Sequence, residues 1–180
     1  MTTLQFTVTF HGPFAVASGV AHDGMDTTID PGNPLPSTAI KGLLKAQLRS
    51  LGASPSLLAS MFHGGDDPRW VFSDAQVEVD VNAWVRVQVD AEGRSKERHL
   101  MVGEQAYATQ GTFCITWEGL GQPPESEVRA LRAAARAISS LGSHRRRGLG
   151  WVSVTDTDAT PWTTADSIAL RTWISQGVSA

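Results

Sequence analysis

A short loop toward the C-terminus combines three arginines with three glycines. Residues 142–150 read Gly-Ser-His-Arg-Arg-Arg-Gly-Leu-Gly and follow a basic segment. Glycine lets a backbone adopt positive φ and approach a ligand closely, while arginines carry planar, permanently charged forks that match phosphate. This composition indicates a site for a polyanion, although a solvated helix end has a similar composition. The candidate residues are Arg145, Arg146, Arg147, Gly148 and Gly150.

A second candidate phosphate site lies at the start of a predicted helix that begins at Ser37 or Thr38 and stops at Gly52. The free N–H groups and partial positive charge of a helix N-terminus attract anions. A glycine inside the helix costs roughly 1 kcal/mol against alanine, so either a sugar-phosphate chain or another helix should approach the bare backbone there. The candidate residues are Ser37, Thr38, Lys41, Gly42, Lys45 and Arg49, with the three basic residues spaced four apart.

The charge distribution supports an anionic partner better than the net charge does. The 180 residues carry a formal charge of −3, which taken whole argues against a nucleic-acid binder. Nine of the 15 Lys and Arg residues, however, lie within 41–49 and 129–147, so we expect a polarised surface.

The same composition favours a cytoplasmic protein with no membrane partner. No apolar run is long enough to cross a bilayer, and the N-terminus lacks the features of a signal peptide. The one cysteine, Cys114, lies in an alternating run that predicts a small buried side chain and cannot form a disulfide within the chain.

Hydrophobic periodicity predicts the elements that must position these residues. An α+β, ferredoxin-like βαββαβ core follows from their order, once an insertion at about 81–109 is set aside. We expect one domain over 1–180, with a functional loop at 11–37 and a C-terminal extension at 156–180. The predicted strands are 4–10, 70–79, 84–89, 112–117 and 151–154, and the predicted helices are the one after Pro36, 126–141 and a short last one at 162–175.

Four segments in order resemble the RAMP superfamily, the repeat-associated RNA-binding proteins of CRISPR effector complexes. This resemblance implies a ferredoxin-like fold with a thumb-like β insertion and a Gly-rich loop after the second helix. The segments are Pro36-Ser-Thr-Ala-Ile-Lys41-Gly42; Met61-Phe62-His63-Gly64 with Trp70-Val-Phe-Ser-Asp74-Ala75; Val85-Arg86 through Glu104 with Gly111-Thr112-Phe113; and Gly142 to Gly150.

Within the superfamily, Gly24-Met-Asp26-Thr-Thr-Ile-Asp30 is similar to the segment of the type III backbone subunit in which the first aspartate serves target-RNA cleavage. The resemblance implies Asp26 as the catalytic residue, with Mg²⁺ or another divalent ion needed for cleavage only. A lone carboxylate can hold a hydrated Mg²⁺ against a phosphate, and Asp23 and Asp30 are near enough in sequence to assist. Acids in such a loop also simply keep it solvated.

The implied protein is a metal-dependent endoribonuclease that acts within a complex. Its partners would be a CRISPR guide RNA, complementary target RNA, further copies of itself and other effector subunits. Two departures leave alternatives open: no histidine follows Gly12-Pro-Phe14 where some backbone subunits carry one, and the chain is short. The alternatives are a non-catalytic structural or capping subunit and a guide-processing endoribonuclease with a histidine base. A generic RNA-recognition module is a further alternative outside the family, but the paired aromatic motif of such modules is absent from the sequence.

Overall fold

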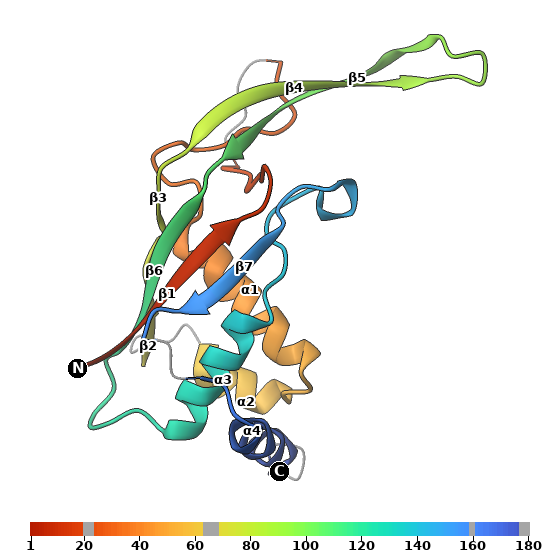
Figure 1. Ribbon diagram of the computed structural model, residues 1–180. Coiled ribbons are helices and arrows are strands. Elements are labelled where there is room, and N and C mark those ends of the chain that lie inside the picture. Colours follow the sequence, from red (N-terminus) through yellow and green to blue (C-terminus); the bar gives the residue numbers. More distant parts are fainter. Residues whose placement is uncertain (20–23, 63–68, 159–160, 177–180) are drawn as a thin grey trace.

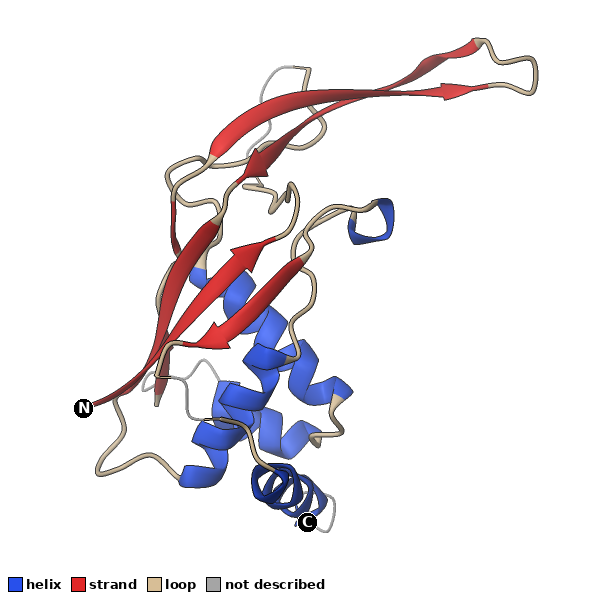
Figure 2. Ribbon diagram, in the orientation of Figure 1, coloured by secondary structure: helices blue, strands red, loops and turns tan. Residues whose placement is uncertain are grey.

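The structure is a computed structural model that describes residues 1–19, 24–62, 69–158 and 161–176. It is α+β, with an antiparallel sheet, a separate two-stranded hairpin and four α-helices (Figures 1 and 2). The sheet strands are β1 (Thr2–Phe10), β2 (Trp70–Phe72), β3 (Gln76–Val77), β6 (Gln110–Trp117) and β7 (Val152–Asp156), and the hairpin strands are β4 (Asp80–Val89) and β5 (Ser95–Tyr107). The helices are α1 (Ser37–Ser50), α2 (Pro55–Phe62), α3 (Glu125–Arg136) and α4 (Thr164–Gln176), with a 3₁₀ turn, η1 (Arg145–Arg147).

The sheet has the strand order β2–β6–β1–β7, and all its pairings are antiparallel. This arrangement is compatible with the predicted ferredoxin-like core. β1 alternates as its sequence predicts, because Leu4, Phe6 and Val8 are buried while Thr3 and Gln5 are exposed. The helices cover one face of the sheet and leave the other face open (Figure 2).

The core lies between that sheet face and the stripes of α1 and α3. Ile40, Leu44 and Leu48 are buried on α1, as the helical spacing predicts, whereas Leu51 just beyond the helix is exposed. The prediction of a helix over 126–141 was wrong at its C-terminal end. α3 ends at Arg136 because the chain then pairs with β7, where the Leu141 N–H donates to the Gly150 carbonyl at 2.8 Å.

Three further sequence predictions needed correction. The strand expected over 70–79 is two short strands, because the chain leaves the sheet between Phe72 and Gln76. Cys114 is half-buried rather than buried, because it lies on the open face of β6. The helix α2 was not predicted at all, although Pro55 at its first position is a favoured helix start.

The hairpin β4–β5 leaves the sheet and projects away from the body of the protein (Figure 1). It occupies most of the range 81–109 in which an insertion was predicted. Its base is joined to the long loop 11–37, since Phe14 and Ala106 exchange backbone hydrogen bonds of 2.8 and 2.9 Å. The loop therefore packs along β5.

Candidate nucleic-acid interface

The Gly-rich loop is held in a fixed shape by the segment that follows β1. The Ser143 N–H donates to the Ala15 carbonyl and the Gly150 N–H to the Pro13 carbonyl, both at 2.7 Å. Gly142 and Gly150 both have positive φ, and a Cβ at either would collide with backbone atoms. Their role is therefore packing, and only Gly148, with open space around it, is free to admit a ligand.

The arginines of this loop form the 3₁₀ turn η1, between α3 and β7. Arg145 and Arg147 are exposed, whereas the side chain of Arg146 lies outside the described part of the structure. The turn is bracketed by two residues in the left-handed region, His144 and Gly148.

The N-terminus of α1 already has a carboxylate partner. Ser37 and Thr38, at the predicted start of this helix, do not act as its cap, because Pro36 occupies the N-cap position. Asp74, from the connection between β2 and β3, accepts the Ser37 N–H at 2.7 Å. These hydrogen bonds to Ser37 lower the pKa of Asp74. The local partial charge of this helix end is thus partly neutralised, which leaves the basic side chains along α1 as its main attraction for anions.

Those basic side chains lie beside open backbone. Lys41 lies over the Phe72 ring at 5.9 Å, while Lys45 is half-buried and Arg49 is exposed at the far end of the helix. Gly42 is exposed, and a Cβ there would meet no atom within 4 Å. Close packing by another helix of the described structure is thereby excluded as the reason for this glycine, and no described residue blocks an external ligand there.

A groove lies beside the start of α1. It measures about 470 Å³ and is lined by Pro36 and Thr38 at the start of α1 and by Val16 and Ser18 of the segment that follows β1. Pro13 and Ala15 of that segment accept hydrogen bonds from the Gly-rich loop, although no residue of the loop lines the groove. The segment 13–18 therefore contacts the Gly-rich loop and also lines a groove with the start of α1.

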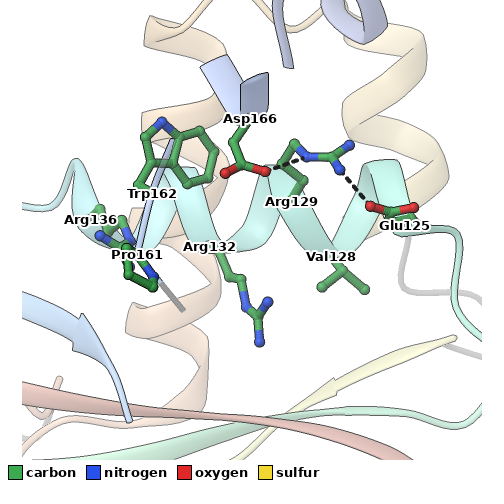
Figure 3. A pocket seen from close by; sticks show the side chains of 8 residues that line it. All are labelled: Glu125, Val128, Arg129, Arg132, Arg136, Pro161, Trp162 and Asp166. Carbon is green, nitrogen blue, oxygen red and sulfur yellow. Dashed lines mark hydrogen bonds and ion pairs between the residues drawn. The ribbon is translucent and has the colours of Figure 1, made fainter. Parts of the chain in front are cut away.

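Three of the six arginines within 129–147 lie on α3 and not in the Gly-rich loop. Arg129 and Arg136 lie beside the C-terminal segment that holds Trp162 and Asp166, whereas Arg132 points toward the sheet (Figure 3). Arg129 pairs with Asp166 at 3.1 Å and with Glu125, and Arg132 lies 2.6 Å from the buried carboxylate of Asp156. Sequence proximity to Arg145–Arg147 was misleading here, because the chain leaves the helix before the loop begins.

Asp26 is placed on the edge of the hairpin. It is exposed, and its Oδ2 accepts the Val102 N–H of β5 at 2.9 Å, while its own N–H donates to the Val102 carbonyl at 2.7 Å. Its other carboxylate oxygen accepts no hydrogen bond from any described residue. One oxygen thus anchors the loop, and the other is free to face a ligand.

Of the two other predicted metal ligands, the structure describes only Asp30. It accepts the Gly32 N–H at 2.9 Å in a local turn and lines the groove, while Asp23 lies outside the described residues. Among the residues that the structure describes, no cluster of three His, Cys, Asp or Glu side chains could hold a metal. Mg²⁺ commonly binds one or two carboxylates together with substrate phosphates, and Asp26 fits that limited role alone.

Sequence reasoning missed two residues that face the Gly-rich loop from the hairpin. Trp84 of β4 packs edge-on against His144 with ring centroids 5.6 Å apart, and Arg86 stacks over Trp84 at 4.6 Å. The alternation of Trp84 and Arg86 in the strand was the available signal, since residues two apart share a face.

Comparison with known proteins shows what this fold resembles. No family model and no curated protein sequence matches the chain. Among solved structures, a chain of the type III-B Cmr-beta complex bound to cognate target RNA, solved by cryo-EM, matches with a TM-score of 0.68 at 10% identity, covering 88% of this chain and 98% of that one. The two chains share a fold.

A chain of the apo state of type III-B Cmr-beta matches equally well, with a TM-score of 0.68 at 10% identity and coverage of 86% and 97%. The predicted resemblance to RAMP proteins of type III effectors is thus confirmed at the level of the fold. No helix within the described ranges has both the length and the apolar character needed to span a membrane.

Proposed function

We propose that this chain is an RNA-binding subunit of a type III CRISPR effector, which assembles in several copies along a guide RNA. The observation that carries the proposal is the segment 13–18, which holds the Gly-rich loop by hydrogen bonds and lines a groove with the start of α1. The shared fold with a Cmr-beta chain, whose complex was solved with cognate target RNA, supports it.

The proposed RNA path runs from η1 across the segment 13–18 to α1. Arg145 and Arg147 would hold phosphates at one end, and Lys41 and Lys45 at the other, with Gly42 leaving the helix backbone open to the sugar-phosphate chain. Phosphate contacts of this kind fix position without reading sequence, so the chain accepts any guide.

Asp26 would act in cleavage of the paired target. In this proposal its free carboxylate oxygen orients a 2′-hydroxyl for attack on the adjacent phosphorus, while its bonded oxygen keeps the loop on β5. The bond from phosphorus to the 5′-oxygen breaks as the 2′-oxygen bond forms, and the proton lost by the 2′-hydroxyl is balanced by the proton taken up by the leaving 5′-oxygen, which gives a 2′,3′-cyclic phosphate and a 5′-hydroxyl. A divalent ion, when bound between Asp26 and a phosphate, would reduce the repulsion between the two anions.

A non-catalytic structural subunit is the second candidate. The hydrogen bonds between Asp26 and Val102 favour it, because they give the carboxylate a structural role that requires no chemistry. Binding of guide RNA is common to both candidates, and cleavage separates them.

Co-expression of the tagged chain with a guide RNA tests the common part. Native mass spectrometry of the purified material should show several copies of the chain on one RNA. A chain that remains monomeric and free of RNA with excess guide would contradict the proposal.

A further inference from the structure

Cationic side chains converge where the middle of the hairpin meets the Gly-rich loop. Arg86 of β4 and Arg147 of η1 line a common cavity of about 430 Å³, together with Val87, Gln88 and Met101. His144 belongs to the same group, because its ring packs against Trp84, over which the Arg86 guanidinium stacks at 4.6 Å. Two elements far apart in the sequence therefore bring three basic groups together.

This cluster has no described counter-charge. None of the five residues that line the cavity is acidic. The Nη1 atom of Arg86 is buried and has no hydrogen-bond partner among the described residues. A buried guanidinium N–H that lacks an acceptor is costly, and arginine forks fit carboxylate or phosphate oxygens in two-point contacts. The arrangement thus indicates a missing anion.

His144 occupies a strained position beside this cavity. Among the described residues it is the only non-glycine with positive φ, at 58°. Such conformations are uncommon for side chains of this size and often accompany functional sites. Burial first, and then the charges of Arg86 and Arg147, lower the pKa of His144. The imidazole is therefore neutral at pH 7 in the free protein, and the arginines alone supply the positive charge.

We propose that Arg86, Arg147 and His144 form a binding site for a phosphodiester group of single-stranded RNA at the junction of the hairpin and the Gly-rich loop. The proposal rests on the RNA-binding function above and extends the interface to the middle of the hairpin. A phosphate there would satisfy the free N–H of Arg86 and connect β4 with the Gly-rich loop, which already touch through Trp84 and His144.

Phosphate binding should also change the protonation of His144. The groups that face its ring are Trp84 and Arg86 from β4 and Arg147 from η1, and none of them is acidic. A bound phosphate offsets the two arginine charges, which raises the pKa of His144 and favours its protonated, hydrogen-bond-donating form. RNA should therefore bind more tightly as the pH falls, with proton uptake on binding.

The site can be tested on the purified chain with fluorescein-labelled oligouridylate and anisotropy. Arg86→Gln should weaken binding by about tenfold or more, because it removes a charge-assisted contact. It should also lower the salt slope by about 0.7. Arg86→Lys should retain the slope but lose part of the affinity, since lysine lacks the planar fork. Arg171→Gln, at an exposed arginine of α4, is the matched control and should bind like the unmodified chain.

The pH dependence gives a second measurement. The pKa of His144, followed by NMR, should rise when oligouridylate is added, and His144→Asn should flatten the pH dependence of the affinity. Asparagine tolerates the left-handed backbone, so this variant should keep the loop conformation. If the unmodified chain binds and Arg86→Gln binds equally with an unchanged slope, this site is overturned and the proposed function stands. If no form of the chain binds oligouridylate, both fall.

Discussion

Asp26 and Val102 form a closed pair of hydrogen bonds, in which the Val102 N–H donates to the Asp26 carboxylate and the Asp26 N–H donates to the Val102 carbonyl. The pair fixes the aspartate loop to the outer edge of the hairpin. One residue along β5, Met101 lines the cavity that contains Arg86 and Arg147. Two neighbouring residues of β5 therefore contact the aspartate loop and line the cavity with the arginines.

Two substitutions of Asp26 should test its proposed part in cleavage apart from its hydrogen bond to Val102. Asp26→Asn keeps an acceptor for the Val102 N–H but removes the charge, whereas Asp26→Ala removes both. In the assembled complex with Mg²⁺, both variants should cleave labelled complementary RNA slower by on the order of 10² or more, because a positioning group is lost. Binding of guide and target should be retained in both.

The control for this comparison is Asp90→Asn at the tip of the same hairpin, where the carboxylate accepts the Arg94 N–H in a local turn. It should cleave at the normal rate. Equal cleavage by Asp26→Asn and Asp90→Asn would assign the chain to the structural alternative.

Gly42→Ala should produce opposite effects on stability and binding. The new methyl group meets no atom of the protein within 4 Å, so alanine should stabilise α1 by up to about 1 kcal/mol in urea unfolding. The same methyl group would obstruct the close approach of a sugar-phosphate chain and weaken RNA binding. A variant that is more stable and binds equally well would show that RNA does not contact this backbone.

Polar substitutions on the hairpin should impair assembly without unfolding the chain. Val85, Val87 and Leu100 are 62%, 49% and 60% exposed, and the strand register places them on one face. An exposed apolar face on a projecting hairpin is suited to contact a neighbouring copy. Val85→Thr with Leu100→Gln, neither of which lines the cavity with Arg86, should change the free energy of unfolding by no more than about 0.5 kcal/mol. Fewer copies per guide RNA are expected in native mass spectrometry, and an unchanged copy number would exclude this face from the contact.

The attachment of α4 to α3, through Arg129 and Asp166, should weaken at acidic pH. Hydrogen bonds from Thr163, and then Arg129, lower the pKa of Asp166 to about 2 from its ordinary value of 3.8. Because the folded-state pKa is depressed, this stabilisation is present above about pH 4 and is lost as the pH falls toward 2. Asp166→Asn should lower the urea midpoint at pH 7, and the difference from the unmodified chain should shrink across that range. A difference that stays constant with pH would contradict this role for the carboxylate.

The core elements could be predicted because their periodicity is local. Alternation in β1 and the stripe of Ile40, Leu44 and Leu48 in α1 each report burial from a few neighbouring residues. The end of α3 could not be predicted, because it depends on pairing with β7 far along the chain.

In the candidate site, too, the residue types could be read from the sequence but their arrangement in space could not. The Gly-rich loop and the basic stripe were visible as residue types, but the segment 13–18 that contacts the loop and lines a groove with the start of α1 was not. The role of Asp74 at the start of α1 was likewise hidden, since the hydrogen bond joins residues 37 positions apart. Three α3 arginines were counted in the expected basic surface, because composition does not reveal which acids will fold beside them.

The salt dependence of RNA affinity tests the central claim most directly. The measurement is the slope of log affinity against log salt for oligouridylate binding, compared between the unmodified chain, the double variant Arg145→Gln/Arg147→Gln, and Arg171→Gln. Each lost phosphate contact should lower the slope by about 0.7, so the double variant should lose about twice that amount and Arg171→Gln none. An unchanged slope and affinity in the double variant would show that these arginines are solvated and do not contact RNA. This result would contradict the proposed interface.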